Sequence, residues 1–379
     1  MKIALVHVML GEFGGAERVL LAMSELWPDA PIYTAFYREG SPAWERFREK
    51  DVRVSWAHHI PGFSTKLHSP LRFLAPVIWN TFDFAQYDVV IGSSSWYVTK
   101  GFAKKGPSAS SGRAKTLEIC YCHTPPRWLY GYPTSVEWQK YAIVRAYANI
   151  VGFFMRQYDY EAAQRVDYFI ANSHETERRI AKFYRREAQV IYPPIDIPST
   201  HNRKKEDYFL VTSRIVGGKG LSLAIAAAKR LGFRLKVAGA PAGYATEHAK
   251  LSRAASSNVE FLGHVSDTEL TQLYARARAF LALATDEDFG MTPVEAMAAG
   301  TPVIAFAGGG YLESVVEGKT GLFFDKPTEA SLAAAIKKFL TIKKDWSKEC
   351  VAQAKKFSKE RFQQEFRDFV EYKVRSAIS

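Results

Sequence analysis

The sequence predicts an α/β fold with two Rossmann-like domains, each a doubly wound parallel sheet, facing each other across a cleft. Three observations support this prediction. The chain has 379 residues, enough for two domains of ordinary size. Apolar runs rich in Val, Ile, Phe and Tyr alternate with helical stretches, which is typical of parallel sheets. These runs are too numerous for one sheet of usual size.

The expected strands fall into two groups, one in each half of the chain. The runs in the first half are 2–8, 31–37, 87–94, 116–122 and 166–173. The runs in the second half are 208–214, 234–239, 259–263, 277–283 and 301–306. Most of these runs are continuously apolar, as expected for strands that are buried on both faces of a sheet.

A proline-rich segment separates the two groups of strands. Residues 190–209 hold two adjacent prolines, a third at Pro198 and a charged polar stretch, which together are typical of a linker. We therefore expect an N-terminal domain over residues 1–197 and a C-terminal domain over residues 198–356. Residues 345–374 have the apolar spacing of one or two amphipathic helices.

The charge of the chain narrows the classes of partner. The net charge is +12, which indicates an anionic partner. The excess is uneven, because residues 53–158 hold 12 Lys or Arg and 4 Asp or Glu, and residues 58–82 interleave aromatic and cationic side chains. Anionic lipid, a phosphorylated substrate and a plain solvated basic face all stay open at this point. Nucleic acid is the weakest interpretation, since the sequence has no helix-turn-helix, finger or RNA-binding aromatic motif.

The cysteines and the start of the chain bear on location. There are 3 cysteines, a low and odd number that argues for a reducing compartment. Cys120 and Cys122 are one residue apart in an apolar run, which favours a strand over a metal site. Residues 1–18 contain only a short apolar run and are interpreted as a first strand instead of a signal peptide. We expect a cytoplasmic protein, with peripheral attachment to the inner face of the cell membrane left open.

The stretch TDEDFGMTPVEAMAAGTPVIAFAGGG (285–310) gathers acids beside a predicted helix start. Thr292 is a candidate N-cap, and Pro293 stands at the favoured first helical position. Glu295 follows Thr292 at capping-box spacing, so a purely structural role competes with a functional one. In the functional interpretation, the helix N-terminus binds a diphosphate. The carboxylates beside it then accept hydrogen bonds from sugar and ribose hydroxyls.

Three further motifs follow predicted strands. TSRIVGGKG places Arg214 and Lys219 beside a glycine-rich turn, where they are solvated cations or neutralise a leaving diphosphate without a metal. GEFGGAERVLL places Gly14 and Gly15 where a tight turn or the close approach of a ligand needs glycine. CYCHTPPRWLYGY places His123 at the end of a strand, where it is structural or hydrogen-bonds a sugar hydroxyl or a transferring group.

Together these four stretches resemble the retaining glycosyltransferases of the GT-B fold, in the large family four. The E-x7-E motif of that family matches Glu287 and Glu295, and SRIVGGKG resembles the family's Arg…Lys diphosphate loop. GGAER resembles its N-terminal glycine loop, and YCHTPP resembles a version found in bacterial mannosyltransferases of surface-polysaccharide assembly. The likeness covers nearly the whole chain.

The resemblance implies roles for the matching residues. Arg214 and Lys219 would hold the donor diphosphate, and His123 would lie near the donor sugar across the cleft. Glu287 would hold the donor sugar, and Glu295 would hold the ribose. The residues implied in catalysis are therefore Glu287, His123, Arg214 and Lys219.

Backbone and base contacts complete the implied site. Gly15 would let the N-domain backbone meet the phosphate, and the nucleotide base would lie near His264 and Val265. The backbone of residues 289–292 would help to hold the sugar. The implied donor-binding residues are Gly15, Arg214, Lys219, His264, Val265, Glu287, Phe289, Gly290, Met291, Thr292 and Glu295.

Two features depart from the family pattern. Ser213 stands where the family carries a glycine before the diphosphate loop. Residues 286–288 also form D-x-D, the metal motif of the other glycosyltransferase fold, but that fold has one sheet domain and lacks the Arg/Lys loop. The expectation is therefore no metal and no cofactor, with the nucleotide sugar bound as a substrate.

The resemblance predicts transfer of a hexose with retention, with GDP-mannose as the preferred donor and a lipid-linked oligosaccharide as the acceptor. UDP-glucose, UDP-GlcNAc or dTDP-rhamnose is the alternative donor, and a phosphorylase or a non-catalytic sugar binder is the alternative function. Residues 58–82 would contact an anionic membrane surface. A final helix over about 357–379 would pack back on the N-terminal domain.

Overall fold

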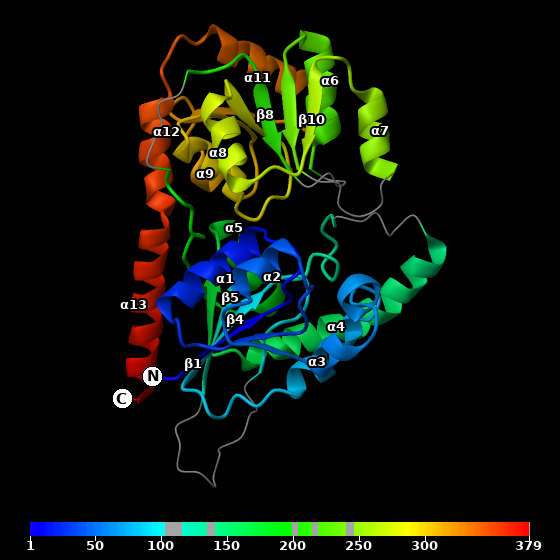
Figure 1. The fold of residues 1–379 in the computed structure, drawn as a ribbon, viewed down its shortest axis with the longest axis vertical. Helices are drawn as coiled ribbons and strands as arrows, with labels where there is room; N and C mark the ends of the chain where they lie inside the picture. The colour runs from blue at the N-terminus through cyan, green and yellow to red at the C-terminus, as the bar shows by residue number, and fades with distance from the viewer. Residues whose placement is uncertain (103–115, 135–140, 199–203, 214–218, 240–245, 379) are drawn as a thin grey trace. The chain divides into compact units, whose positions relative to one another are not determined.

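The chain divides into two compact units in a computed structural model that describes residues 1–102, 116–134, 141–198, 204–213, 219–239 and 246–378 (Figure 1). The first unit comprises residues 1–132, 141–194 and 360–379, and the second comprises residues 133–140 and 195–359. Apart from the short segment 133–140, the chain enters the second unit at Ile195 and returns to the first at Glu360.

The first unit contains a seven-stranded sheet in the order β3-β2-β1-β4-β5-β6-β7. Its strands are β1 (Ile3–His7), β2 (Ile32–Thr34), β3 (Val52–Val54), β4 (Val89–Ser94), β5 (Leu117–Cys122), β6 (Tyr168–Ala171) and β7 (Ala188–Val190). All neighbouring strands are parallel. The strand order reverses between β1 and β4, and open sheets of this kind bind ligands at the carboxyl ends of the strands beside that point.

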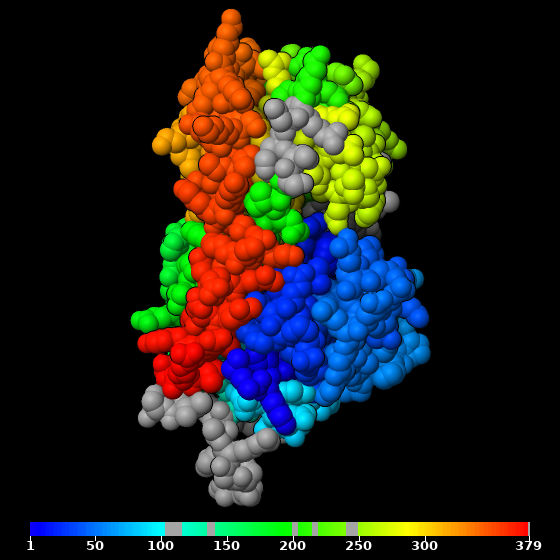
Figure 2. Space-filling model, turned by 60° about the vertical axis from the view of Figure 1, so that its left-hand side comes forward, coloured from blue at the N-terminus to red at the C-terminus, as the bar shows by residue number. Residues whose placement is uncertain are grey.

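Helices and short turns cover both faces of this sheet. The helices are α1 (Gly15–Leu26), α2 (Pro42–Phe47), α3 (Ala75–Asn80), α4 (Ala142–Arg165), α5 (His174–Tyr184) and α13 (Lys359–Ile378). Shorter turns are η1 (Trp56–His59), η2 (Phe63–Leu67) and η3 (Arg72–Leu74). The final helix, α13, lies beside α1 (Figure 2), where the Gln363 side chain donates to the Ala22 carbonyl at 3.1 Å. Phe362 and Phe366 of α13 are buried in the core that β1 and α1 share.

The second unit contains a six-stranded sheet in the order β10-β9-β8-β11-β12-β13. Its strands are β8 (Phe209–Thr212), β9 (Leu235–Ala238), β10 (Val259–Gly263), β11 (Ala279–Ala282), β12 (Val303–Phe306) and β13 (Gly321–Phe324). Its helices are α6 (Leu221–Leu231), α7 (Thr246–Ala254), α8 (Asp267–Arg276), α9 (Met291–Ala298), α10 (Tyr311–Ser314), α11 (Glu329–Thr341), α12 (Ser347–Ala354) and the turn η5 (Lys355–Phe357). The order again reverses at one point, between β8 and β11.

The predicted fold class, two Rossmann-like domains with parallel sheets, is confirmed. All ten expected strands form, but β3, β7 and β13 are additional. β3 and β7 are three-residue strands at the two edges of their sheet, and β13 is an edge strand of four residues that begins with Gly321. β3 (VRV) and β7 (AQV) have a polar residue between two apolar ones, and β13 (GLFF) begins with glycine, so none of the three contains a long continuous apolar run.

A buried ion pair ties α4 to the segment that follows β4. Lys100 and Asp159 are both almost fully buried, and the Lys100 ammonium donates to one Asp159 oxygen. The Tyr130 hydroxyl donates to the other Asp159 oxygen at 2.8 Å, and Lys100 also donates to the Tyr184 hydroxyl at 3.1 Å. The two charges therefore compensate each other in the interior, and removal of either leaves the other unpaired.

None of the helices in the described ranges combines the length and the hydrophobicity needed to cross a bilayer. Cys120 and Cys122 lie buried in β5, as the strand interpretation of that segment predicted. Burial raises the pKa of the Cys120 thiol well above its usual range.

Candidate active site

Lys219 and Glu287 meet at the carboxyl edge of the second sheet. Lys219 lies between β8 and α6, and Glu287 lies between β11 and α9. Because β8 and β11 are neighbours at the point where the strand order reverses, their following loops converge. The Lys219 ammonium donates to Glu287 Oε2 at 2.7 Å, and the two side chains are 34% and 20% exposed. The pair is therefore accessible to a ligand.

The glycine run 308–310 holds the loop that carries Glu287. The Gly310 amide donates to the Glu287 carbonyl at 3.0 Å. Gly309 has φ of +56°, and a Cβ atom there would lie 2.4 Å from the same carbonyl oxygen. A larger residue would meet both the left-handed backbone and the close contact, so glycine at position 309 sets the place of Glu287.

The helix after Glu287 begins two residues earlier than the sequence indicated. Its N-cap is Gly290, with φ of +83°, and Met291 is the first helical residue. The expectation that Thr292 is the N-cap and Pro293 the first helical residue is therefore wrong. The sequence rule favours a hydroxyl cap, but here the chain turns in the left-handed region, which glycine adopts without a Cβ penalty. No side chain among the described residues caps this helix start.

Glu295 does not form the capping box that its spacing from Thr292 suggested. Instead, the Tyr274 hydroxyl donates to Glu295 Oε2 at 3.0 Å, and the same hydroxyl lies 2.9 Å from the Thr212 hydroxyl at the end of β8. Glu295 is half-buried. Tyr274 is thus a neighbour of the expected ribose-binding carboxylate that sequence reasoning missed, since α8 lies apart from both motifs in the sequence.

The other expected donor-binding residues of this unit surround the same edge. His264 is exposed and Val265 is half-buried, and both follow β10 at its carboxyl end. Phe289 is buried, with its ring centroid 5.4 Å from that of Phe357. Arg214, the second expected diphosphate ligand, lies outside the described residues.

In the first unit, His123 is joined to three side chains that sequence reasoning did not select. His123 Nε2 lies 2.9 Å from the Ser93 hydroxyl, which lies 3.0 Å from His7 Nδ1. His7 Nε2 lies 3.3 Å from Glu17 Oε1. Strand register brings these side chains together, because His7 at the end of β1 pairs directly with Ser93 of β4. The His123 amide donates to the Ser94 carbonyl at 2.9 Å, which fixes the residue beside β4.

Burial shapes the electrostatics of this chain of side chains. Burial, with a smaller contribution from the nearby His7, lowers the pKa of His123 to about 3. Burial by itself would raise the pKa of Glu17, but the hydrogen bonds that its carboxylate makes with His7 and with the Gly14 amide outweigh burial, so the Glu17 pKa is lowered. At neutral pH the site therefore holds a neutral His123 imidazole and a Glu17 carboxylate.

The glycine loop of the first unit lies at the same sheet edge. Gly14 is the N-cap of α1, and its amide donates to Glu17 Oε2 at 2.8 Å. Gly15, the expected phosphate contact, is the first helical residue and is exposed. One Glu17 carboxylate oxygen therefore accepts from the amide at the helix start, and the other lies beside His7 Nε2. Glu17 lies within the GGAER motif, but no local pattern links it to its partner His7, which is ten residues away in the preceding strand.

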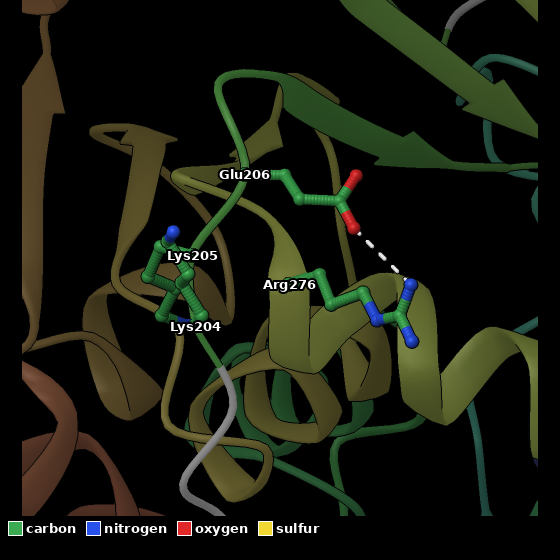
Figure 3. Close-up of a pocket in the computed structure, with 4 residues that line it drawn as sticks. All are labelled: Lys204, Lys205, Glu206 and Arg276. Carbon is green, nitrogen blue, oxygen red and sulfur yellow. Dashed lines mark hydrogen bonds and ion pairs between the residues drawn. The ribbon is translucent and has the colours of Figure 1, made fainter.

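A hollow of about 450 Å³ in the second unit is lined by Lys204, Lys205, Glu206 and Arg276 (Figure 3). Arg276 donates to Glu206 at 3.2 Å. Lys204 to Glu206 precede β8, and Arg276 precedes β11, so the hollow lies at the amino ends of these strands. It is thus at the opposite edge of the sheet from Lys219 and Glu287 and is not part of the candidate active site.

Two parallel Rossmann-like sheets, with a cation and a carboxylate at the switch point of the second, are the arrangement expected of the GT-B class of glycosyltransferases. Family comparison agrees with this class. The family model described as Glycosyltransferase Family 4 matches residues 13–198, and the model described as Glycosyl transferases group 1 matches residues 194–357. Together the two models match residues 13–357, and the chain belongs to the GT-B glycosyltransferases that they describe.

The similar proteins carry the names of different glycosyltransferases. The chain is 36% identical over 138 residues to a glycogen synthase of Mycobacterium tuberculosis, a match that covers 35% of the chain and only 33% of that protein. It is 25% identical over 386 residues to the alpha-1,3/1,6-mannosyltransferase ALG2 of Mus musculus, covering 89% of the chain and 87% of that protein. Among solved structures, Anabaena Alr3699/HepE in complex with UDP and glucose is similar with a TM-score of 0.74 at 19% identity. That likeness covers 98% of this chain and 99% of the other, and it shows the shared fold.

Proposed function

We propose that this protein transfers a hexose from a nucleotide diphosphate sugar to an oligosaccharide acceptor, with retention at the anomeric carbon. The observation that carries the proposal is the Lys219–Glu287 pair, 2.7 Å apart at the carboxyl edge of the second sheet. A partly exposed cation at such an edge suits a diphosphate, and a carboxylate beside it suits sugar hydroxyls. Membership of the glycosyltransferase family supports the same chemistry.

The chemistry of the step follows from these groups. Lys219, together with Arg214, balances the charge that develops on the leaving diphosphate, in place of a divalent ion. Glu287 accepts hydrogen bonds from the sugar hydroxyls and keeps Lys219 in place. No carboxylate is assigned as a nucleophile of the kind that retaining glycosidases use. The leaving phosphate instead takes the proton of the acceptor hydroxyl on the same face of the sugar.

Metal independence and retention are tested together. The expected result is full turnover in the presence of a strong chelator and a product whose anomeric configuration, measured by NMR, equals that of the donor. Turnover that is abolished by the chelator and restored by manganese would contradict the role given to Lys219 and Arg214. An inverted product would contradict the same-face mechanism.

The favoured donor is GDP-mannose. The likeness of YCHTPP to bacterial mannosyltransferases and the mannosyltransferase name of the ALG2 relative support mannose. UDP-glucose is the competing donor, because the HepE structure contains UDP and glucose. Since base and sugar selection depend on a few pocket contacts of about 1–3 kcal/mol each, the fold does not decide between them.

A thermal-shift panel of GDP-mannose, UDP-glucose, UDP-GlcNAc and dTDP-rhamnose separates these donors. A ligand at one hundred times its Kd stabilises the folded protein by about 2.7 kcal/mol, so the true donor raises Tm. Lys219→Ala should abolish the shift, whereas Lys229→Ala, which removes an exposed cation of α6, should leave it unchanged. An undiminished shift in Lys219→Ala would contradict the placement of the diphosphate.

The proposed acceptor is a lipid-linked oligosaccharide at an anionic membrane surface. Support comes from α4, on which Ile143, Ile150, Phe153 and Phe154 are 86%, 64%, 60% and 64% exposed. Exposed Arg145 and Arg156 lie on the same helix, and residues 141–158 contain no acid. A helix that combines exposed apolar side chains with cations is typical of a membrane interface.

Only some of the apolar residues in 58–82 are exposed, and only these are available for the expected contact with a membrane. Phe63, Ile78 and Trp79 are buried in the core of the first unit, while Phe73 and Val77 are exposed. The segment also contacts α4, since the Tyr147 hydroxyl donates to the Pro70 carbonyl. The proposed membrane surface is therefore α4 together with the exposed side chains of 58–82.

Co-sedimentation with vesicles tests this surface. The protein should bind vesicles that contain phosphatidylserine at low salt and bind those of phosphatidylcholine weakly, because near-surface cations contribute about 1 kcal/mol each. A Phe153→Ser/Phe154→Ser variant should lose most of the binding, and Leu312→Ser, which changes an exposed apolar residue of the second unit, should not. Equal binding by both variants would overturn the assignment of α4.

A further inference from the structure

Four side chains of the first unit form one continuous line of hydrogen-bonding groups. The line runs from Glu17 through His7 and Ser93 to His123, with distances of 3.3, 3.0 and 2.9 Å. His7 and Ser93 are buried. His123 is half-buried at the carboxyl end of β5, where a sheet of this class binds its ligand.

We propose that Glu17, His7 and Ser93 are positioning residues that fix the tautomer of His123, so that its Nδ1 atom offers a lone pair to a ligand hydroxyl. The meaning of this tautomer for catalysis rests on the proposed function. The tautomer itself depends only on the contacts within this unit. It can therefore be tested without turnover.

The direction of each hydrogen bond follows from the first one. An ionised carboxylate only accepts, so His7 Nε2 must carry the proton that it shares with Glu17. With one proton on the His7 ring, Nδ1 then has a lone pair and accepts the hydroxyl proton of Ser93, whereas a second proton on that ring would make Nδ1 a donor and reverse the two bonds that follow. The Ser93 oxygen in turn accepts from His123 Nε2–H.

The last bond leaves His123 with an unprotonated Nδ1. No protein group in the described ranges hydrogen-bonds this atom, whereas Nε2 is engaged by Ser93. The lowered pKa of His123, caused mainly by burial, agrees with a neutral ring. His123 is thus set to accept from a hydroxyl of the bound sugar and to disfavour an acceptor group, such as a carbonyl, in the same place.

The contacts of Glu17 make Glu17→Gln a direct test. Glu17 Oε2 accepts from the Gly14 amide at 2.8 Å. In the variant, the side-chain carbonyl oxygen should keep facing the Gly14 backbone amide, because a side-chain NH2 group in its place would set two donors against each other. The new NH2 group would then face His7 Nε2 and donate to it. Every hydrogen bond in the line reverses, and His123 should carry its proton on Nδ1.

The tautomer can be measured by long-range 1H–15N correlation of histidine-labelled protein at pH 8, with His123 assigned through His123→Gln. The wild-type ring should be protonated on Nε2, and Glu17→Gln should move the proton to Nδ1. Ser93→Ala, which interrupts the line, should give a mixture, and Ser94→Ala, the next residue of the same strand, should match the wild type. A wild-type ring protonated on Nδ1, or a His123 spectrum that Glu17→Gln leaves unchanged, would overturn the inference.

Kinetics separate this inference from the proposed function. If Glu17→Gln moves the proton and lowers kcat/KM for the donor at least tenfold, both hold. If the proton moves and kcat/KM stays constant, the positioning network stands and His123 does not contact the reacting sugar. Should Glu17→Gln fail to fold, the Ser93→Ala and Ser94→Ala spectra test the network in its place. A Ser93→Ala spectrum identical to that of the wild type would then overturn the inference.

Discussion

Replacing Gly309 by alanine should displace Glu287 and weaken donor binding. The backbone φ of +56° places this residue in the left-handed region, which costs an alanine about 1–2 kcal/mol. The new Cβ atom would also lie 2.4 Å from the Glu287 carbonyl oxygen, so one of the two loops has to move. Overpacking of this kind costs a further ~1–3 kcal/mol. The total expected loss of stability is therefore about 2–5 kcal/mol.

Gly318→Ala is the matched control for this change. Gly318 has φ of +72°, but a Cβ atom there meets no other atom within 4 Å. Gly318→Ala carries only the free-energy cost of a left-handed backbone. The difference in unfolding free energy between the two variants therefore isolates the cost of the contact with Glu287. Urea unfolding of both variants gives the two free energies of unfolding.

Calorimetric titration with the donor identified by the thermal-shift panel completes the test. A hydrogen bond to a charged group contributes about 1.5–3 kcal/mol, so a displaced Glu287 should weaken donor binding by roughly 10- to 150-fold. Gly318→Ala should bind the donor as tightly as the wild type. If the two variants lose equal stability and Gly309→Ala keeps its donor affinity, the reasoning that the glycine run positions Glu287 is wrong.

Two further predictions concern stability. Lys100→Met should destabilise the fold by about 3–5 kcal/mol in urea unfolding, because it leaves the buried Asp159 carboxylate unpaired, and a near-zero change would refute this. The pKa of His123 is about 3 in the folded protein against an ordinary value of 6.5, so its contribution to stability is complete above pH 6.5 and is lost as the pH falls toward 3. His123→Gln should therefore make the unfolding free energy less dependent on pH in this window, and an unchanged pH dependence would argue against a ring that the fold keeps neutral.

The two sheet edges differ in how much of each could be predicted from the sequence. In the second unit, Lys219 and Glu287 were both selected from local motifs, and the structure brings them within 2.7 Å. Each motif follows an apolar run, and parallel strands bring their following loops to one edge. In the first unit only His123 and Gly15 were selected. His7 and Ser93 lie inside apolar strands, where a single polar residue gives no local signal of its partner.

Local rules were least reliable where backbone conformation overrode residue preference. Thr292 and Glu295 have the spacing of a capping box, but the left-handed Gly290 starts the helix earlier and Glu295 pairs with Tyr274. A preference for hydroxyl caps describes isolated helix starts. Here the position of the loop is set by its contact with the glycine run, which follows the next strand, β12.

The sequence by itself determined the α/β class, the two sheets and the motifs that mark their carboxyl edges, since hydrophobic periodicity and glycine placement are local properties of the chain. Only the tertiary structure decided which side chains face each other. His7 reaches Ser93 through the pairing of β1 with β4, and Glu295 reaches Tyr274 through the packing of α8 on α9. Partners of this kind are far apart along the chain, and strand register and helix packing, which no local pattern encodes, bring them together.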